Sequence, residues 1–160
     1  VAYSLKGLRF KEIPFLDSIT SSIHFVGPLF VAAAYFGFPT SVWPFIGAFF
    51  LWGIASHAFG AVQDIIPDKK GGLHSVATII GARATVWLSL GFYLISCILI
   101  GVQGGLAILI GIAGLLYVVN LLPYILVTEK TSGGTNPGWR RFIWINYIVG
   151  AVVTIILILS

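Results

Sequence analysis

The chain has 160 residues and a formal net charge of +4, and 58% of its residues are hydrophobic whereas only 9% are charged. Soluble domains carry about 25% charged residues. This composition therefore excludes an ordinary soluble protein and indicates an integral membrane protein. The positive charge requires no nucleic-acid partner, because basic residues beside anionic membrane lipid account for it.

Five apolar runs come close to the ~20 residues that a helix needs to cross the hydrocarbon core of a bilayer. In chain order they cover residues 19–36, 42–63, 84–101, 105–127 and 142–159. Prolines inside these runs are expected to kink the helices rather than to prevent them. The predicted fold class is all-α and integral to the membrane, with five transmembrane helices in a single domain over residues 1–160.

The charged residues lie outside these runs or at their edges. The successive connections carry three, zero, three, zero, three and zero basic residues, starting from the N-terminal segment. The positive-inside rule then places the N-terminus and the two long connections in the cytoplasm and Ser160 on the far side.

Asp64 and Asp68 form the strongest chemical signal in the chain, because they lie four residues apart in a polar loop after the second run. Two carboxylates this close repel each other, so the pair is more naturally a site for a divalent cation. If the helix continues, the carboxylates share one face a turn apart; if Pro67 breaks it, Asp68 folds back beside Asp64. In either geometry Mg²⁺ would need the oxygens of a diphosphate to complete its shell. A solvated acidic loop is the alternative.

Other polar residues gather in the same half of the membrane. His57 and Gln63 recur at helical spacing before Asp64, and Asn120 lies at the cytoplasmic end of the fourth run. These positions suggest a cavity open to the cytoplasm, with the aspartates at its mouth and apolar walls toward its floor. His57 is more naturally a neutral hydrogen-bonding side chain than a metal ligand. Asn120 is equally well explained as a tie between helices, and Asp17 as a helix N-cap.

Basic residues on the same side are candidates to neutralise phosphate charge. Lys69 and Lys70 follow Asp68 directly, and Lys6, Arg9 and Lys11 precede the first run. Two other classes of function stay open on these residues alone. One is a transporter module that binds its cation at the acidic pair, and the other is a non-catalytic membrane subunit.

Asp64, Asp68 and the continuation through residue 82, with Ser75 and Gly81, resemble the second aspartate-rich motif of the UbiA superfamily of intramembrane prenyltransferases. Residues 8–28 are similar to the branch that prenylates carotenoids, the lycopene elongases. The family fold has nine transmembrane helices around a central cavity, and the resemblance implies that the five runs are its fifth to ninth helices. It also implies a prokaryotic cell membrane as the location.

The resemblance implies an enzyme that moves a prenyl group from an allylic isoprenyl diphosphate to a lipophilic acceptor. A carotenoid such as lycopene is the favoured acceptor, and a quinone precursor or a lipid is the alternative. Asp64 and Asp68 would be the catalytic residues and would bind Mg²⁺. The candidate substrate-binding residues are Tyr3, Lys6, Arg9, Lys11, His57, Gln63, Lys69, Lys70 and Asn120.

The sequence departs from the family pattern in two places. It lacks the family's first motif, NDxxDxxxD, and it contains no methionine at all. We therefore expect it to be the C-terminal portion of a longer protein whose N-terminal portion carries that motif. The family's YxxxK element is imperfect as well, because Lys6 follows Tyr3 at three positions rather than four.

Overall fold

The structure is a computed structural model that describes residues 13–159. Five long helices dominate it, and each is long and apolar enough to cross a membrane. Their bounds are Leu16–Tyr35 (α1), Trp43–Val62 (α2), Ala82–Gly101 (α5), Ala107–Leu121 (α6) and Asn136–Leu159 (α7). No strand occurs within the described range. The all-α prediction with five transmembrane helices is confirmed.

Short helical elements join the long ones. They are η2 (Thr40–Val42), α3 (Ile65–Gly71), α4 (Val76–Ile80), η3 (Leu122–Tyr124) and η4 (Glu129–Thr135). The segment between the second and third long helices is therefore largely helical, whereas the sequence predicted a polar loop there. The cause is visible in the pattern: Ser75 caps α4, and Gly72 with a φ of 67° ends α3 in the left-handed conformation.

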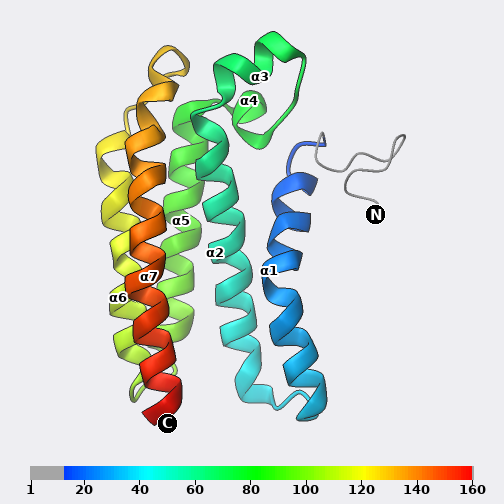
Figure 1. The fold of residues 1–160 in the computed structure, drawn as a ribbon, viewed down its shortest axis with the longest axis vertical. Helices are drawn as coiled ribbons and strands as arrows, with labels where there is room; N and C mark the ends of the chain where they lie inside the picture. Colours follow the sequence, from blue (N-terminus) through cyan, green and yellow to red (C-terminus); the bar gives the residue numbers. More distant parts are fainter. Residues whose placement is uncertain (1–12, 160) are drawn as a thin grey trace.

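Helix α2 is the centre of the bundle (Figure 1). It packs against α1 on one side and α5 on the other, and α6 lies against α5 and is followed by α7. Elements α3 and α4 cover one end of the bundle, and η4 lies against α3 at that same end. The two short connections, from α1 to α2 and from α5 to α6, lie at the opposite end.

Two helix boundaries differ from the predicted runs. Helix α6 ends at Leu121 rather than near residue 127, because Pro123 has no backbone N–H to continue the helix and the chain tightens into η3. Helix α7 begins at Asn136 rather than near residue 142. Its first turns are polar, so an apolar run could not reveal them, and Pro137 in the first turn is compatible with a helix start.

Small residues and hydroxyl groups hold the helices together. Ser96 of α5 donates a hydrogen bond of 2.8 Å to the carbonyl oxygen of Ala48 in α2, and Ser22 of α1 bonds the carbonyl of Phe50 in α2. Such contacts and close packing replace the hydrophobic driving force that is absent between helices in lipid. The buried core includes Ala55, Phe59, Val62, Val86, Tyr93, Tyr117, Leu121 and Phe142.

Helices α5 and α6 approach each other closely at Gly111. A Cβ atom added there would lie 2.9 Å from the carbonyl oxygen of Cys97 and 3.3 Å from the Cα of Gly101. Both are backbone atoms, so the helices themselves would have to separate. We expect Gly111→Ala to lower the free energy of unfolding in detergent by about 1–3 kcal/mol, the usual cost of overpacking.

Gly91 of α5 provides the matched control, because nothing lies within 4 Å of the position that its Cβ would take. Gly91→Ala should be neutral or stabilising by up to about 1 kcal/mol through helix propensity. Equal effects of the two substitutions would show that the α5–α6 contact does not limit stability.

Candidate active site

Asp64 and Asp68 lie where α2 gives way to α3. The chain turns through Gln63 and Asp64 after Val62, and Asp64 is the N-cap residue of α3. The backbone amide of Asp68 donates a hydrogen bond of 2.8 Å to the carbonyl oxygen of Asp64. Pro67 lies in the first turn of α3, where its missing N–H breaks no helical bond. The aspartates are therefore one helical turn apart at the start of α3. The helix breaks before Asp64 rather than continuing through it or breaking at Pro67, so neither of the two predicted geometries is matched in full.

Both carboxyl groups have raised pKa values. The pKa of Asp64 lies above its ordinary value of 3.8, first because of partial burial and second because of the nearby charge on Asp68. Burial also raises the pKa of Asp68; a hydrogen bond with Ser75 opposes this effect, and the charge of Asp17 adds to it. A divalent cation held by Asp64 and Asp68 would relieve this repulsion, so the pair fits a Mg²⁺ site.

The pair alone would not complete a metal shell. Within residues 13–159, no three side chains of His, Cys, Asp or Glu gather in a group that could hold a metal ion. Magnesium commonly takes one or two carboxylates and fills its remaining positions with water and phosphate oxygens. The donor set therefore fits Mg²⁺ together with a phosphorylated ligand better than a structural metal.

The segment after α3 supports the aspartates. Ser75 and Thr78 form a capping box at the start of α4: the Thr78 amide donates to Ser75 Oγ at 3.3 Å, and the Ser75 amide donates to Thr78 Oγ1 at 2.8 Å. Helix α4 packs against α2 and α5. Because Ser75 also bonds Asp68, the capping box fixes one of the two carboxylates relative to the bundle.

The two neighbouring lysines differ. Lys69 Nζ donates to Glu129 Oε2 at 2.8 Å, and this ion pair joins α3 to η4. Lys70 is exposed and has no ion pair with any residue of the described segment. Both lysines are predicted to contact phosphate, but within the described segment Lys69 is held in an ion pair and Lys70 is not. Tyr3, Lys6, Arg9 and Lys11 lie outside the described residues.

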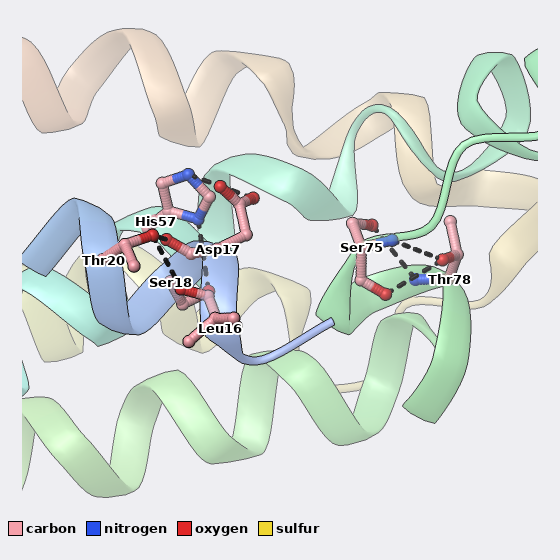
Figure 2. A network of polar contacts seen from close by, with 7 residues as sticks. All are labelled: Leu16, Asp17, Ser18, Thr20, His57, Ser75 and Thr78. Atoms are coloured by element: carbon pink, nitrogen blue, oxygen red, sulfur yellow. Dashed lines mark hydrogen bonds and ion pairs between the residues drawn. The ribbon is translucent and has the colours of Figure 1, made fainter. Parts of the chain in front are cut away.

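His57 makes contact with two residues of α1. Its Nδ1 lies 3.2 Å from Ser18 Oγ, and its Nε2 lies 3.5 Å from Asp17 Oδ2. Figure 2 shows the imidazole directed toward this part of α1, with the Ser75–Thr78 capping box in the same region. Asp17 is not the N-cap of α1, because Phe15 holds that position without a side-chain hydrogen bond. Instead, Asp17 lies in the first turn of α1, where a carboxylate is favoured by the helix dipole.

Gln63 and Asn120 tie helices together. Asn136 Nδ2 donates to Gln63 Oε1 at 2.6 Å, which links the end of α2 to the start of α7. Asn120 is buried; its Nδ2 donates to the carbonyl of Gly138 at 2.9 Å, and its Oδ1 accepts from Arg141 Nε at 3.0 Å. For Asn120 these contacts favour the interhelical role over substrate binding.

An apolar cavity of about 860 Å³ lies in the half of the bundle away from α3. All five long helices contribute to its wall, with Phe25, Phe49, Ile100, Ile110 and Val153 as representative residues. Trp52, Tyr117 and Asn146 mark its limit on the side nearer α3.

Neither aspartate lines this cavity. Aromatic rings fill the space between α2, α6 and α7 on the α3 side: Phe59 packs on Tyr124 with ring centres 5.8 Å apart, and Trp139 stacks on Phe142 at 4.9 Å. The Trp139 ring lies over Gly60, where an added Cβ would be 3.1 Å away.

Asp17, Ser75 and Glu129 are absent from the residues that the sequence predicts for this site. The spacing of Ser75 and Thr78 is that of a capping box, and this is the signal that could have identified Ser75. Glu129 carries no such signal, because it meets Lys69 only through folding.

The chain was compared with known proteins. The family model described as the UbiA prenyltransferase family matches residues 1–146. A lycopene elongase/hydratase from Corynebacterium glutamicum is 45% identical over 160 residues, which cover 99% of this chain and 56% of the relative. A C(50) beta-cyclic carotenoids biosynthesis protein, LbtBC, from Dietzia sp. is 45% identical over 163 residues, covering 100% of this chain and 38% of the relative.

A lycopene elongase/hydratase from Haloarcula japonica is 37% identical over 87 residues, covering 54% of this chain and 29% of the relative. The chain thus spans about half the length, or less, of these curated relatives. No solved structure matches it.

The Ser75 cap can be tested separately from catalysis. Ser75→Ala removes the side-chain acceptor of the first turn of α4, a change that usually costs about 1 kcal/mol. We expect faster hydrogen exchange at the Thr78 amide and unchanged exchange in α5. Thr154→Ala, which removes a hydroxyl bonded only to its own helix at Gly150, is the control and should leave α4 unchanged. Protection at Thr78 that survives Ser75→Ala would contradict the capping role.

Proposed function

The chain belongs to the UbiA prenyltransferase family, and from this premise we propose that it forms part of an enzyme that transfers a prenyl group from an allylic isoprenyl diphosphate to a lipophilic acceptor. The observation that carries the proposal is the order in which a charged part and an apolar part follow each other along the axis of the bundle. A carboxylate pair suited to Mg²⁺ and diphosphate lies at one end of the bundle, and a large apolar cavity lies below it.

In this proposal Asp64 and Asp68 hold Mg²⁺. An ion held there would supply Lewis-acid stabilisation of a diphosphate leaving group. In the reaction, the allylic carbon–oxygen bond breaks and its electron pair leaves with the diphosphate. Lys70 would compensate part of the negative charge of the diphosphate, because it follows Asp68 by two residues on α3 and its side chain is exposed. The Lys69–Glu129 pair and the Ser75 hydrogen bond keep α3 in position.

The bundle below the aspartates would exclude water from the reacting carbon. An allylic cation that meets water is lost to hydrolysis, so a dry pocket protects the transfer reaction. The aromatic layer of Phe59, Tyr124, Trp139 and Phe142 and the apolar cavity wall serve this purpose. The double bond of the acceptor then supplies the electron pair for the new carbon–carbon bond.

A carotenoid such as lycopene is the acceptor that we favour. The relatives from Corynebacterium and Haloarcula are named lycopene elongase/hydratase, and the cavity wall offers few polar groups to a ligand. A quinone precursor would need hydrogen-bond partners for its ring oxygens. The hydroxyls of Tyr117 and Ser96 are engaged within the bundle, with Asn146 Oδ1 and the Ala48 carbonyl respectively.

The protein is integral to the membrane, and we propose that the α3 end faces the cytoplasm. Basic residues before α1 and in the two long connections support this orientation by the positive-inside rule. In the described segment they belong to elements at the α3 end: Lys69 and Lys70 to α3, Arg83 to the first turn of α5, Lys130 to η4, and Arg140 and Arg141 to the first two turns of α7.

The metal role predicts a specific loss of activity. Asp64→Asn or Asp68→Asn in the complete protein should reduce prenyl transfer from an allylic diphosphate to lycopene by about a hundredfold or more, because each removes an electrostatic group that acts on the breaking bond. Both variants should still insert into membranes. Product formation is measured by chromatography of extracted carotenoids.

Glu129→Gln is the control for a lost negative charge at the same end of the bundle. Its ion pair with Lys69 is half exposed and contributes about 0–1 kcal/mol, so activity should stay within a few-fold of the parent. Normal activity of both aspartate variants would exclude the metal role. Cation flux through proteoliposomes without any prenyl diphosphate would instead favour a transporter.

The raised pKa values of Asp64 and Asp68 predict how pH affects the pair. A carboxyl group whose pKa is raised by folding destabilises the folded state when it ionises, so the metal-free protein should gain stability as pH falls through these values. Protonation also competes with Mg²⁺. We therefore expect the Mg²⁺-induced rise in Tm to shrink as pH is lowered, beginning above the range of an ordinary aspartate. A Mg²⁺ effect that persists in the Asp64→Asn, Asp68→Asn double variant would place the ion elsewhere.

A further inference from the structure

The contacts between α1 and α2 extend from the cavity toward the α3 end of the bundle. At the cavity, Phe25 of α1 packs edge-on against Trp52 of α2 with ring centres 5.8 Å apart. Toward the α3 end, Ser18 and Asp17 of α1 meet His57 of α2. His57 lies about 7 Å beyond Trp52 at the helical rise of 1.5 Å per residue.

The charge of Asp17 acts on Asp68, so the α3 end of this contact is linked to the proposed metal site as well. His57 is thus between the two parts of the proposed site, where the reacting carbon of an allylic diphosphate would lie if its diphosphate is at the aspartates and its tail extends toward the cavity.

The contacts of His57 suit a proton acceptor. Ser18 Oγ lies 3.2 Å from Nδ1, and in the tautomer in which Nδ1 donates to this hydroxyl, Nε2 carries the lone pair. Nε2 is 3.5 Å from Asp17 Oδ2, too far for a direct hydrogen bond yet close enough for the carboxylate to stabilise an imidazolium. The His57 side chain remains 27% exposed, so it is accessible, whereas Asp17 is 12% exposed.

The proposed reaction needs such a group. When the double bond of the acceptor attacks the allylic carbon, the positive charge passes to a carbon of the acceptor. The charge is removed in one of two ways: an adjacent C–H bond breaks and its electron pair forms a new double bond, or a water oxygen adds and an O–H bond breaks. Either route releases one proton, and a positioned base accelerates such a step by about 10²–10⁴-fold.

We propose that His57, oriented by Ser18 and paired with Asp17, is the base that accepts this proton at Nε2, an inference that rests on the proposed prenyl transfer. The imidazolium is compensated by the Asp17 carboxylate, and it returns its proton to water at the α3 end after product formation. The word hydratase in the names of the relatives indicates that the water route occurs among them.

Other polar groups in this region are engaged in holding the bundle. Tyr93 and Ser56 hydrogen-bond each other at 3.0 Å, and Tyr117 donates to Asn146 at 2.8 Å. The other two histidines, His24 and His74, are exposed and have no hydrogen bond or ion pair to any residue between 13 and 159. His57 is accordingly the histidine that the described structure orients.

The test uses the complete protein in membranes with lycopene, Mg²⁺ and an allylic diphosphate of five carbons or longer. His57→Ala should lower turnover by about a hundredfold or more while Mg²⁺-dependent binding of the donor changes by less than about threefold. Added imidazole should restore at least about tenfold of the lost rate, because it can occupy the vacated space and accept the proton. His57→Gln, which keeps the volume and a hydrogen bond to Ser18, should be as slow and should not respond to imidazole.

His24→Ala is the matched control and should keep the parent rate with and without imidazole. Turnover of His57→Ala and His57→Gln within about threefold of the parent would overturn the inference. So would a loss that imidazole does not restore although donor binding is intact. If the parent protein itself transfers no prenyl group, the proposed function fails and the role of His57 falls with it, so the two failures are distinguishable.

Discussion

The close approach of α2 to its neighbours is the constraint on which the rest of the structure depends. Helices in lipid gain little from apolar burial, so they must meet through small residues and side-chain hydrogen bonds. Gly53 of α2 lies directly beneath Ser22 of α1, and Gly60 lies beneath the ring of Trp139 of α7. Because α2 is held on both sides in this way, the position of its end at Val62 is fixed, and with it the start of the segment that carries the aspartates.

Polarity changes along α2 in a graded way. Its first part lines an apolar cavity, its second half carries a histidine in contact with a carboxylate and a hydroxyl, and its end leads into two partly exposed carboxylates. Each environment suits one part of the proposed prenyl transfer between a charged donor and an apolar acceptor. The order follows from the depth in the membrane, since charged groups are tolerated near the surface and are costly toward the centre.

Hydropathy was sufficient to predict the five long helices. The distribution of basic residues predicted that the two long connections lie at the same end of the bundle. The acidic pair was visible because both of its members lie within one turn of chain. The contacts of His57, Lys69 and Asn120 could not be predicted, because each partner comes from another helical element. A single sequence does not reveal which residues of distant elements meet. Helix α3 was missed because its polar residues resemble a loop, and α4 because five residues are too few to show helical periodicity; only their caps reveal them.

The turn between α2 and α3 separates the two aspartates from the membrane-spanning helix α2. The spacing of Asp64 and Asp68 is set within α3 by the bond from one backbone to the other, and α3 is attached sideways through Glu129 and Ser75. The spacing of the two carboxylates is therefore set by local backbone geometry, whereas the orientation of α3 depends on its contacts with η4 and α4. A substitution that weakens the packing of α4 or η4 would therefore turn α3 as a unit and move both carboxylates together, without changing the backbone spacing between them.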